Sequence, residues 1–146
     1  MNGGALLPVR PTPMTRDEAR RFLEDMFDRL FDPAASAEAV GAFFAPDYVQ
    51  EVDGKRLDYS AFLDHVRLLK RTLERASVTF EQLLVDGSTI ADIHVVDAHK
   101  KNGERLRVKV LAFYTIEDGK IRRLEELTHQ LEGRPEDADL GSRTAD

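Results

Sequence analysis

The chain has 146 residues, 27 of them acidic and 21 basic, which gives a net charge of −6, and it contains no cysteine. This length fits one domain that buries a core without covalent staples. The acidic balance disfavours partners such as nucleic-acid phosphates and anionic lipids. The lack of cysteine excludes disulfides, thiolate nucleophiles and cysteine-ligated zinc. No apolar run has the length of a membrane span. The first residues do not read as a secretory signal, so we expect a cytoplasmic protein with a flexible arm over residues 1–14.

The first part of the chain predicts a pair of helices. Thr15 and Glu18 form a capping-box pattern, and apolar residues recur at helical spacing from there to Asp32. Pro33 stops this helix, and a second, shorter helix is expected to end at Ala45, before a further proline. Both helices present phenylalanines to a common core.

A short strand and a third helix follow. Residues 47–52 alternate and are rich in strand-forming side chains, and an Asp-Gly pair ends them. Asp58 is placed to cap the next helix. The buried stripe of that helix is predicted to be Tyr59, Phe62, Val66, Leu69 and Leu73.

The second half of the chain changes to strand-like alternation. Asp-Gly and Asn-Gly pairs divide it into four strands, over residues 77–85, 88–101, 104–117 and 120–132. Consecutive hairpins give an antiparallel meander, and three amphipathic helices can cover only one of its faces. We therefore predict an α+β domain in which three helices pack on a curved antiparallel sheet and enclose a pocket. It should span residues 15–133 and be followed by an acidic, flexible tail at 134–146.

Two turns decide which residues face the pocket, because a slip of one residue exchanges the faces of a strand. We interpret residues 117–119 and 101–103 each as a three-residue loop ending in a left-handed glycine. This register places His94 and Glu126 in one row, two strands apart, with Asp92 one step along. Three ionisable side chains then converge on an otherwise apolar surface.

The first of these hairpins has an alternative interpretation. A two-residue turn at 102–103 would exchange the faces of its first strand. Asp97 and His99 would then turn inward, and Asp92 and His94 would turn outward. The position of Glu126 depends only on the second turn.

Several segments resemble the nuclear transport factor 2-like superfamily, in its SnoaL-like branch. The resemblance covers about residues 15–133 and rests on the order of elements, on FFAPDYVQEVDG and on the closing hairpin FYTIEDGKIRRLEELT. This superfamily includes polyketide cyclases, ketosteroid isomerases and limonene epoxide hydrolases as well as binding modules. The resemblance therefore implies a cone-shaped fold around a pocket and does not select one activity.

Some roles follow from the resemblance residue by residue. Glu126 occupies the final-strand position where the cyclases and epoxide hydrolases place a pocket aspartate. Asp92 and His94 stand where the epoxide hydrolases carry an aspartate and an arginine, and the missing arginine argues against epoxide hydrolysis. Val52 and Ala112 stand where ketosteroid isomerases carry acidic groups, which disfavours steroid isomerisation.

We therefore expect acid/base chemistry on a small, largely apolar molecule, with Glu126 as base or acid and His94 and Asp92 as partners. Cyclisation, isomerisation, dehydration and hydrolysis all stay open. The structural alternative is a buried carboxylate paired with Arg122 or His94. The functional alternatives are a non-catalytic carrier or sensor and a dimeric accessory module. Further ligand-binding candidates are Tyr48, Gln50, Tyr114, Val110, Leu124, Thr128, Phe27, Phe62 and His65.

The expected partners are a small-molecule ligand and a second copy of the chain. We expect no cofactor and no metal, because Asp92, His94 and Glu126 fit neither an HxH nor an HExxH spacing. The outer sheet face mixes charged and apolar side chains, which is typical of an interface and predicts a homodimer packed sheet against sheet. Its apolar members are Ile93, Val95, Leu111, Phe113, Ile121 and Leu127.

Overall fold

The computed structural model describes residues 13–146, so the predicted arm lies outside the described residues except for its last two positions. The helices are α1 (Arg16–Leu30), α2 (Ala37–Gly41) and α3 (Tyr59–Thr72). The strands are β1 (Phe44–Val52), β2 (Lys55–Asp58), β3 (Leu73–Asp86), β4 (Thr89–Lys100), β5 (Arg105–Glu117) and β6 (Lys120–Glu132). Two 3-10 turns, η2 (Pro135–Asp137) and η3 (Leu140–Ser142), end the chain.

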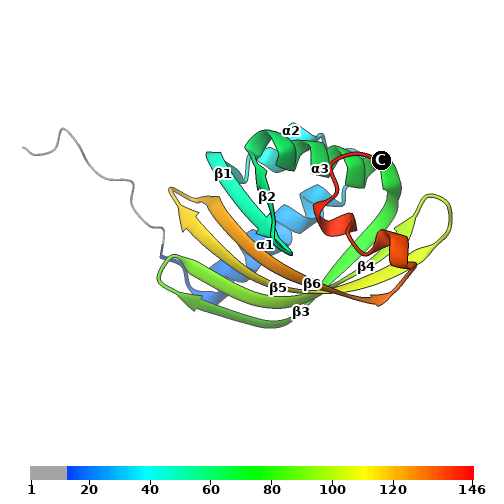
Figure 1. Ribbon diagram of the computed structural model, residues 1–146. Coiled ribbons are helices and arrows are strands. Elements are labelled where there is room, and N and C mark those ends of the chain that lie inside the picture. The colour runs from blue at the N-terminus through cyan, green and yellow to red at the C-terminus, as the bar shows by residue number, and fades with distance from the viewer. Residues whose placement is uncertain (1–12) are drawn as a thin grey trace, which may run out of the picture.

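All six strands form one curved sheet in the order β2-β1-β6-β5-β4-β3. The β1–β6 pair is parallel and the other pairs are antiparallel. The helices lie on the concave side of this sheet (Figure 1). The α+β class predicted from the sequence is confirmed. Among the described residues, each helix falls short of the length and apolar character that crossing a membrane requires.

Local side-chain bonds begin the helices where the sequence indicates. Thr15 and Glu18 form both bonds of the capping box at α1. Asp58 accepts from the backbone N–H of Ala61 and caps α3, as predicted. Lys70 of α3 donates to three carbonyls at the end of α1, at 2.9–3.2 Å. This lysine therefore ties the two long helices together and satisfies carbonyls that α1 leaves free.

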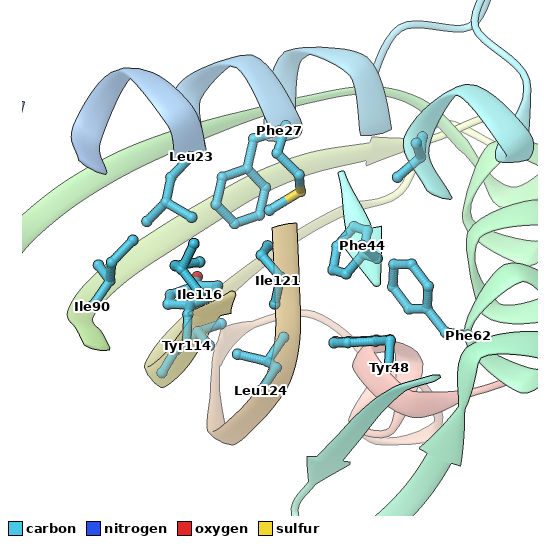
Figure 2. Packing of buried hydrophobic residues seen from close by; sticks show 14 of the residues in the cluster. Leu23, Phe27, Phe44, Tyr48, Phe62, Ile90, Tyr114, Ile116, Ile121 and Leu124 are labelled. Carbon is cyan, nitrogen blue, oxygen red and sulfur yellow. The ribbon is translucent and has the colours of Figure 1, made fainter. Parts of the chain in front are cut away.

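The core lies between α1 and the concave face of the sheet. Leu23 and Phe27 point from α1 toward Tyr114 and Ile116 of the sheet (Figure 2). A second group of rings packs beside them, with centroids 4.4–5.1 Å apart, at Phe44, Tyr48 and Phe62. Edge-on and tilted contacts at this distance are favourable between aromatic rings.

Several elements differ from the prediction. The second helix ends at Gly41, and β1 already begins at Phe44. The strand β2 was missed, because it is only four residues long and follows a tight turn. Leu73 begins β3 instead of ending the α3 stripe. Of the predicted stripe, Phe62, Val66 and Leu69 are buried, whereas Tyr59 and Leu73 are half-buried. His65 and Leu68 are buried in addition.

The register of the β4–β5 hairpin is confirmed. His94 lies opposite Val110 and Asp92 lies opposite Ala112, as the three-residue loop requires. Gly103 adopts a φ of 91°, the left-handed conformation that this loop needs and that glycine adopts without strain. The alternative two-residue turn is therefore wrong.

The β5–β6 hairpin differs from the prediction. Glu117 pairs with Lys120 across a two-residue turn, in which Asp118 and Gly119 have φ of 51° and 76°. One extra residue, Arg122, then forms a bulge between the paired positions of Ile121 and Arg123. The turn and the bulge together shift the pairing by two positions, so Glu126 stays inward but lies opposite Ala112 instead of Val110. The same bulge turns Ile121 into the core, where it is fully buried, and Arg122 out to solvent.

The packing of α1 against the sheet predicts a large stability loss on truncating Leu23. This side chain is fully buried, so Leu23→Ala should lower the free energy of unfolding by about 2–5 kcal/mol. Asp25→Ala, an exposed position on the same helix, should change it by less than about 0.5 kcal/mol. Urea unfolding followed by circular dichroism measures both. Equal effects of the two substitutions would contradict this assignment of the core.

Candidate functional site

A cavity of about 130 Å³ lies between α1, α3 and the concave face of the sheet. Cavities near this size accommodate a benzene-sized molecule in other proteins. Most of the wall is apolar. The lining residues are Met26, Phe27, Leu30, Phe31, Phe44, Gln50, Phe62, His65, Leu69, Leu73, His94, Val96, Ala98, Leu106, Val108, Val110, Tyr114, Leu124, Glu126, Thr128, Asp137, Ala138, Leu140 and Gly141.

Ten of the twelve residues predicted for the site line this cavity. The other two, Tyr48 and Asp92, are buried behind the lining and bond to residues that do line it. Sequence reasoning missed the aliphatic residues toward the ends of the strands and the whole contribution of the C-terminal segment. The aliphatic residues carried a signal, because Val96, Leu106 and Val108 continue the inward alternation.

His94 is held by a buried hydrogen-bond network. Its Nδ1 bonds to Oδ1 of Asp92 at 2.9 Å, and Tyr114 donates its hydroxyl to Oδ2 of the same carboxylate at 3.2 Å. Asp92 and His94 are both almost completely buried. Because the carboxylate accepts from Nδ1, the neutral imidazole keeps its lone pair on Nε2. The ring lies in contact with Phe27, at a centroid distance of 5.0 Å.

Gln50 is oriented by a second network. Tyr48 donates its hydroxyl to Oε1 of Gln50 at 2.7 Å, and both side chains are buried. This bond occupies one lone pair of the amide oxygen and orients the amide, and its N–H groups are the donors that Gln50 can offer. Burial raises the pKa values of Tyr48 and Tyr114 well above their ordinary value, so both hydroxyls stay protonated donors at neutral pH.

Glu126 brings a carboxyl group to the cavity without a protein partner. Within residues 13–146, no hydrogen bond or ion pair engages its side chain. Burial raises the pKa of this carboxyl to about 7; the protonated form of His94 opposes the shift, while the charges of Asp92 and Asp53 add to it. The predicted alternative of a pair with Arg122 is wrong, because the bulge sends this arginine outward to bridge Asp47 and Glu117.

The strands fix how these groups face one another. Asp92, Ala112 and Glu126 lie in one row across β4, β5 and β6. His94 lies in the next row, with Val110 and Thr128. The cavity therefore holds a carboxyl group and an imidazole from strands that are two apart. Ala112 lies on β5, between these two strands, and its methyl group is too small to separate the carboxyl group from the imidazole.

The end of the chain closes one side of the cavity, which contradicts the predicted flexible tail. Residues 135–142 form the two 3-10 turns, and Asp137, Leu140 and Ser142 are buried. In Figure 1 this red segment lies between α3 and the sheet. Leu140 is the one large apolar residue after Leu131 in the sequence, and it was the available signal for this packing.

The residues of the site do not form a metal centre in the described part of the chain. No group of three or more histidine, aspartate and glutamate side chains within residues 13–146 is arranged to hold an ion. The polar groups of the cavity are instead suited to hydrogen bonding and proton transfer.

Comparison with known proteins shows the family of the chain. The sequence profile of the SnoaL-like domain matches residues 19–124. The chain belongs to the SnoaL-like domain family. An uncharacterized protein of Schizosaccharomyces pombe is 35% identical to this SnoaL-like domain protein over 125 residues, which cover 86% of this chain and 96% of the yeast protein.

Solved structures share the fold of this SnoaL-like domain at low sequence identity. An LEH-like epoxide hydrolase from M. tuberculosis has a TM-score of 0.64 and 19% identity, covering 78% of this chain and 84% of that one. A Catenulispora acidiphila protein with a ketosteroid isomerase-like fold, in complex with trimethylamine, has a TM-score of 0.60 and 14% identity, covering 72% and 82%. At these identities the likeness extends to the fold alone.

The raised pKa of Glu126 makes the stability of this SnoaL-like domain depend on pH. Below about pH 4.5 the carboxyl is protonated in both folded and unfolded chains; between 4.5 and 7 only the unfolded chain releases the proton. The free energy of unfolding therefore falls as the pH rises through this range, and the total loss is roughly 3 kcal/mol once the pH is above 7. Glu126→Gln removes this loss, so the variant should gain stability relative to the wild type between pH 4.5 and pH 8. Urea unfolding at both pH values tests this, and a pH-independent difference would contradict it.

Proposed function

We propose that this SnoaL-like domain binds a small, largely apolar organic molecule in its cavity and catalyses a proton-transfer reaction on it. The observation that carries the proposal is the unpartnered carboxyl of Glu126, held in an apolar cavity with a pKa of about 7. A general acid or base works best when its pKa lies near the working pH, because both protonation states are then populated. If Glu126 had only a structural role, its desolvation without a partner would lower the stability of the fold and give nothing in return.

Each polar group of the cavity then has a separate task. Glu126 takes a proton from the bound molecule or delivers one to it. His94 offers Nε2 as the second proton-transfer group. The Gln50 amide nitrogen donates to an oxygen of the ligand, which fixes its orientation.

Asp92 acts as a positioning residue in this proposal. It does not line the cavity, and its two oxygens bond to His94 and Tyr114. The carboxylate therefore selects the imidazole tautomer and stabilises the imidazolium when His94 accepts a proton. Cyclisation, isomerisation and dehydration each need such a pair of proton-transfer groups, whereas hydrolysis also needs room for a water molecule.

A carrier or sensor is the second candidate function. The mostly apolar wall and the small number of oriented polar groups are also what a binding site without chemistry requires. The two candidates differ in what Glu126 does: a carrier needs it only as a hydrogen-bonding group, and an enzyme needs its ionisation.

Substitution of Glu126 separates the two candidates. The wild type is assayed against a panel of small carbonyl compounds, enones, alcohols and epoxides, and binding of the best ligand is measured by calorimetry. Glu126→Gln should lower kcat about 10²- to 10⁴-fold while the Kd of the ligand stays within a few-fold. Glu125→Gln is the matched control, because Glu125 is the neighbouring residue of the same strand and is exposed. Ligands that bind without turnover by the wild type would establish the carrier.

We also propose that two copies of the chain associate through the outer sheet face. Leu84, Phe113 and Leu127 are 61–66% exposed there, beside the half-exposed Leu111. Strand pairing places these residues in two adjacent rows across β3, β5 and β6. Both signs of charge surround them, so the face complements a two-fold copy of itself. Of the residues predicted for this face, Ile121 lies in the core and Val95 is buried.

Sedimentation tests this association. The wild type should sediment as a dimer at micromolar concentration, and Phe113→Lys should sediment as a monomer, because a charge at the centre of an apolar interface stays unpaired. Ser60→Lys, which adds the same charge at an exposed position of α3, should leave the dimer intact. A wild type that is monomeric at this concentration would refute the proposal.

A further inference from the structure

The C-terminal segment, residues 134–146, is built into the wall of the cavity. Asp137, Ala138, Leu140 and Gly141 line it directly. These residues come after the last strand of the sheet and are therefore not needed to complete any strand pair. They belong to the wall of a cavity of about 130 Å³, which is smaller than the 300–1,000 Å³ that is usual for small-molecule sites.

Charged groups latch the segment to β4. Lys100 donates to both carboxylate oxygens of Asp137, at 3.1 and 3.2 Å. The two side chains are only 16% and 6% exposed, so water screens this ion pair little. Glu104 also contacts Lys100, at 3.4 Å, and forms an ion pair with Arg134 at the start of the segment.

A second latch connects the segment to α3. Nδ1 of His65 lies 2.8 Å from the carbonyl oxygen of Arg143 and donates to it. Burial lowers the pKa of His65 to about 4, so the ring is neutral near pH 7 and carries its proton on Nδ1. The segment is thus bonded at one end to the sheet and at the other end to the helix that faces it.

Leu140 fills the space between these two latches. It is buried in an apolar cluster that is separate from the main core and that also contains Leu68, Leu69, Ala98 and Leu106. The cluster lies where α3 and the ends of β4 and β5 meet. Leu140 is the member that the C-terminal segment contributes, and it lines the cavity from this side.

We infer that residues 134–146 form a lid that sets the length of the molecule the cavity accepts, with Leu140 as the residue that determines the limit. This inference rests on the proposed binding role of the cavity. The ligand class is a compact molecule, about one six-membered ring in length. Opening of the lid for ligand exchange breaks the Lys100–Asp137 pair.

Two hydrocarbons test the limit without involving the polar groups. Benzene and naphthalene are titrated into ¹⁵N-labelled protein and followed by NMR. The wild type should bind benzene and exclude naphthalene. Leu140→Ala, which removes three carbon atoms from the wall, should bind naphthalene at least about tenfold more tightly than the wild type does. The affinity of Leu140→Val for naphthalene should lie between those of the wild type and Leu140→Ala. Because valine removes fewer atoms, this variant tests the limit even if the alanine variant does not keep the lid folded. Leu131→Ala, at a partly exposed position that does not line the cavity, should behave as the wild type.

The latch is tested by amide hydrogen exchange. Asp137→Asn leaves Lys100 without its main charged partner, so exchange over residues 137–142 should accelerate by about tenfold or more. Unchanged exchange would refute the latch.

Failure of the lid and failure of the site give different results. If naphthalene binds the wild type as tightly as the Leu140 variants, or if those variants bind benzene and still exclude naphthalene, the length limit is refuted and the cavity remains a binding site. If neither hydrocarbon binds any of these proteins, the cavity is not a ligand site, and the proposed function fails with the inference.

Discussion

The candidate site depends on the alternation of side chains along β4, β5 and β6. Each strand has only two faces, so one register per hairpin decides whether the ionisable residues meet in the cavity or in water. In the β4–β5 hairpin a left-handed glycine fixes this choice. In the β5–β6 hairpin the turn is one residue shorter than the sequence suggested, and the Arg122 bulge adds a residue that restores the inward face. Glu126 reaches the cavity because these two irregularities act together.

The polar groups of the cavity are stabilised unequally. Asp92, His94 and Tyr114 satisfy one another, and Tyr48 satisfies Gln50. Glu126 is left outside both networks and loses solvation without gaining a partner. Glu126 is half-buried by exposed area, and a partly desolvated charge without a partner destabilises a fold. The unfavourable desolvation in the cavity therefore falls mainly on the carboxyl group of Glu126. In the proposed binding role, a ligand supplies the hydrogen bond that this group lacks.

Local patterns predicted much of the fold and part of the site. The capping residues, the inward alternation of β4 and the left-handed Gly103 act over a few residues, so they can be read from the chain. The bulge at Arg122 was missed, although the three-residue step from Ile121 to Leu124 is its trace in the sequence. The closing C-terminal segment was missed, because its one sequence signal is a single leucine in a short polar stretch and its order comes from distant contacts. The separation of Asp92 and Tyr48 from the lining likewise depends on side-chain packing, which a strand pattern does not specify.

In the proposed binding role, the Tyr48–Gln50 bond gives the cavity a preference in hydrogen-bond polarity. Tyr48 occupies one lone pair of the amide oxygen and fixes the amide in an orientation in which its N–H groups remain as donors. A carbonyl or ether oxygen placed there completes a donor–acceptor pair, whereas a second N–H group would face a donor and remain unpaired. An unpaired buried donor costs about 1–3 kcal/mol, which is enough to distinguish a ketone from an ammonium group of similar shape by one to two orders of magnitude in affinity. In that role, one phenol hydroxyl outside the lining determines which functional group the lining prefers.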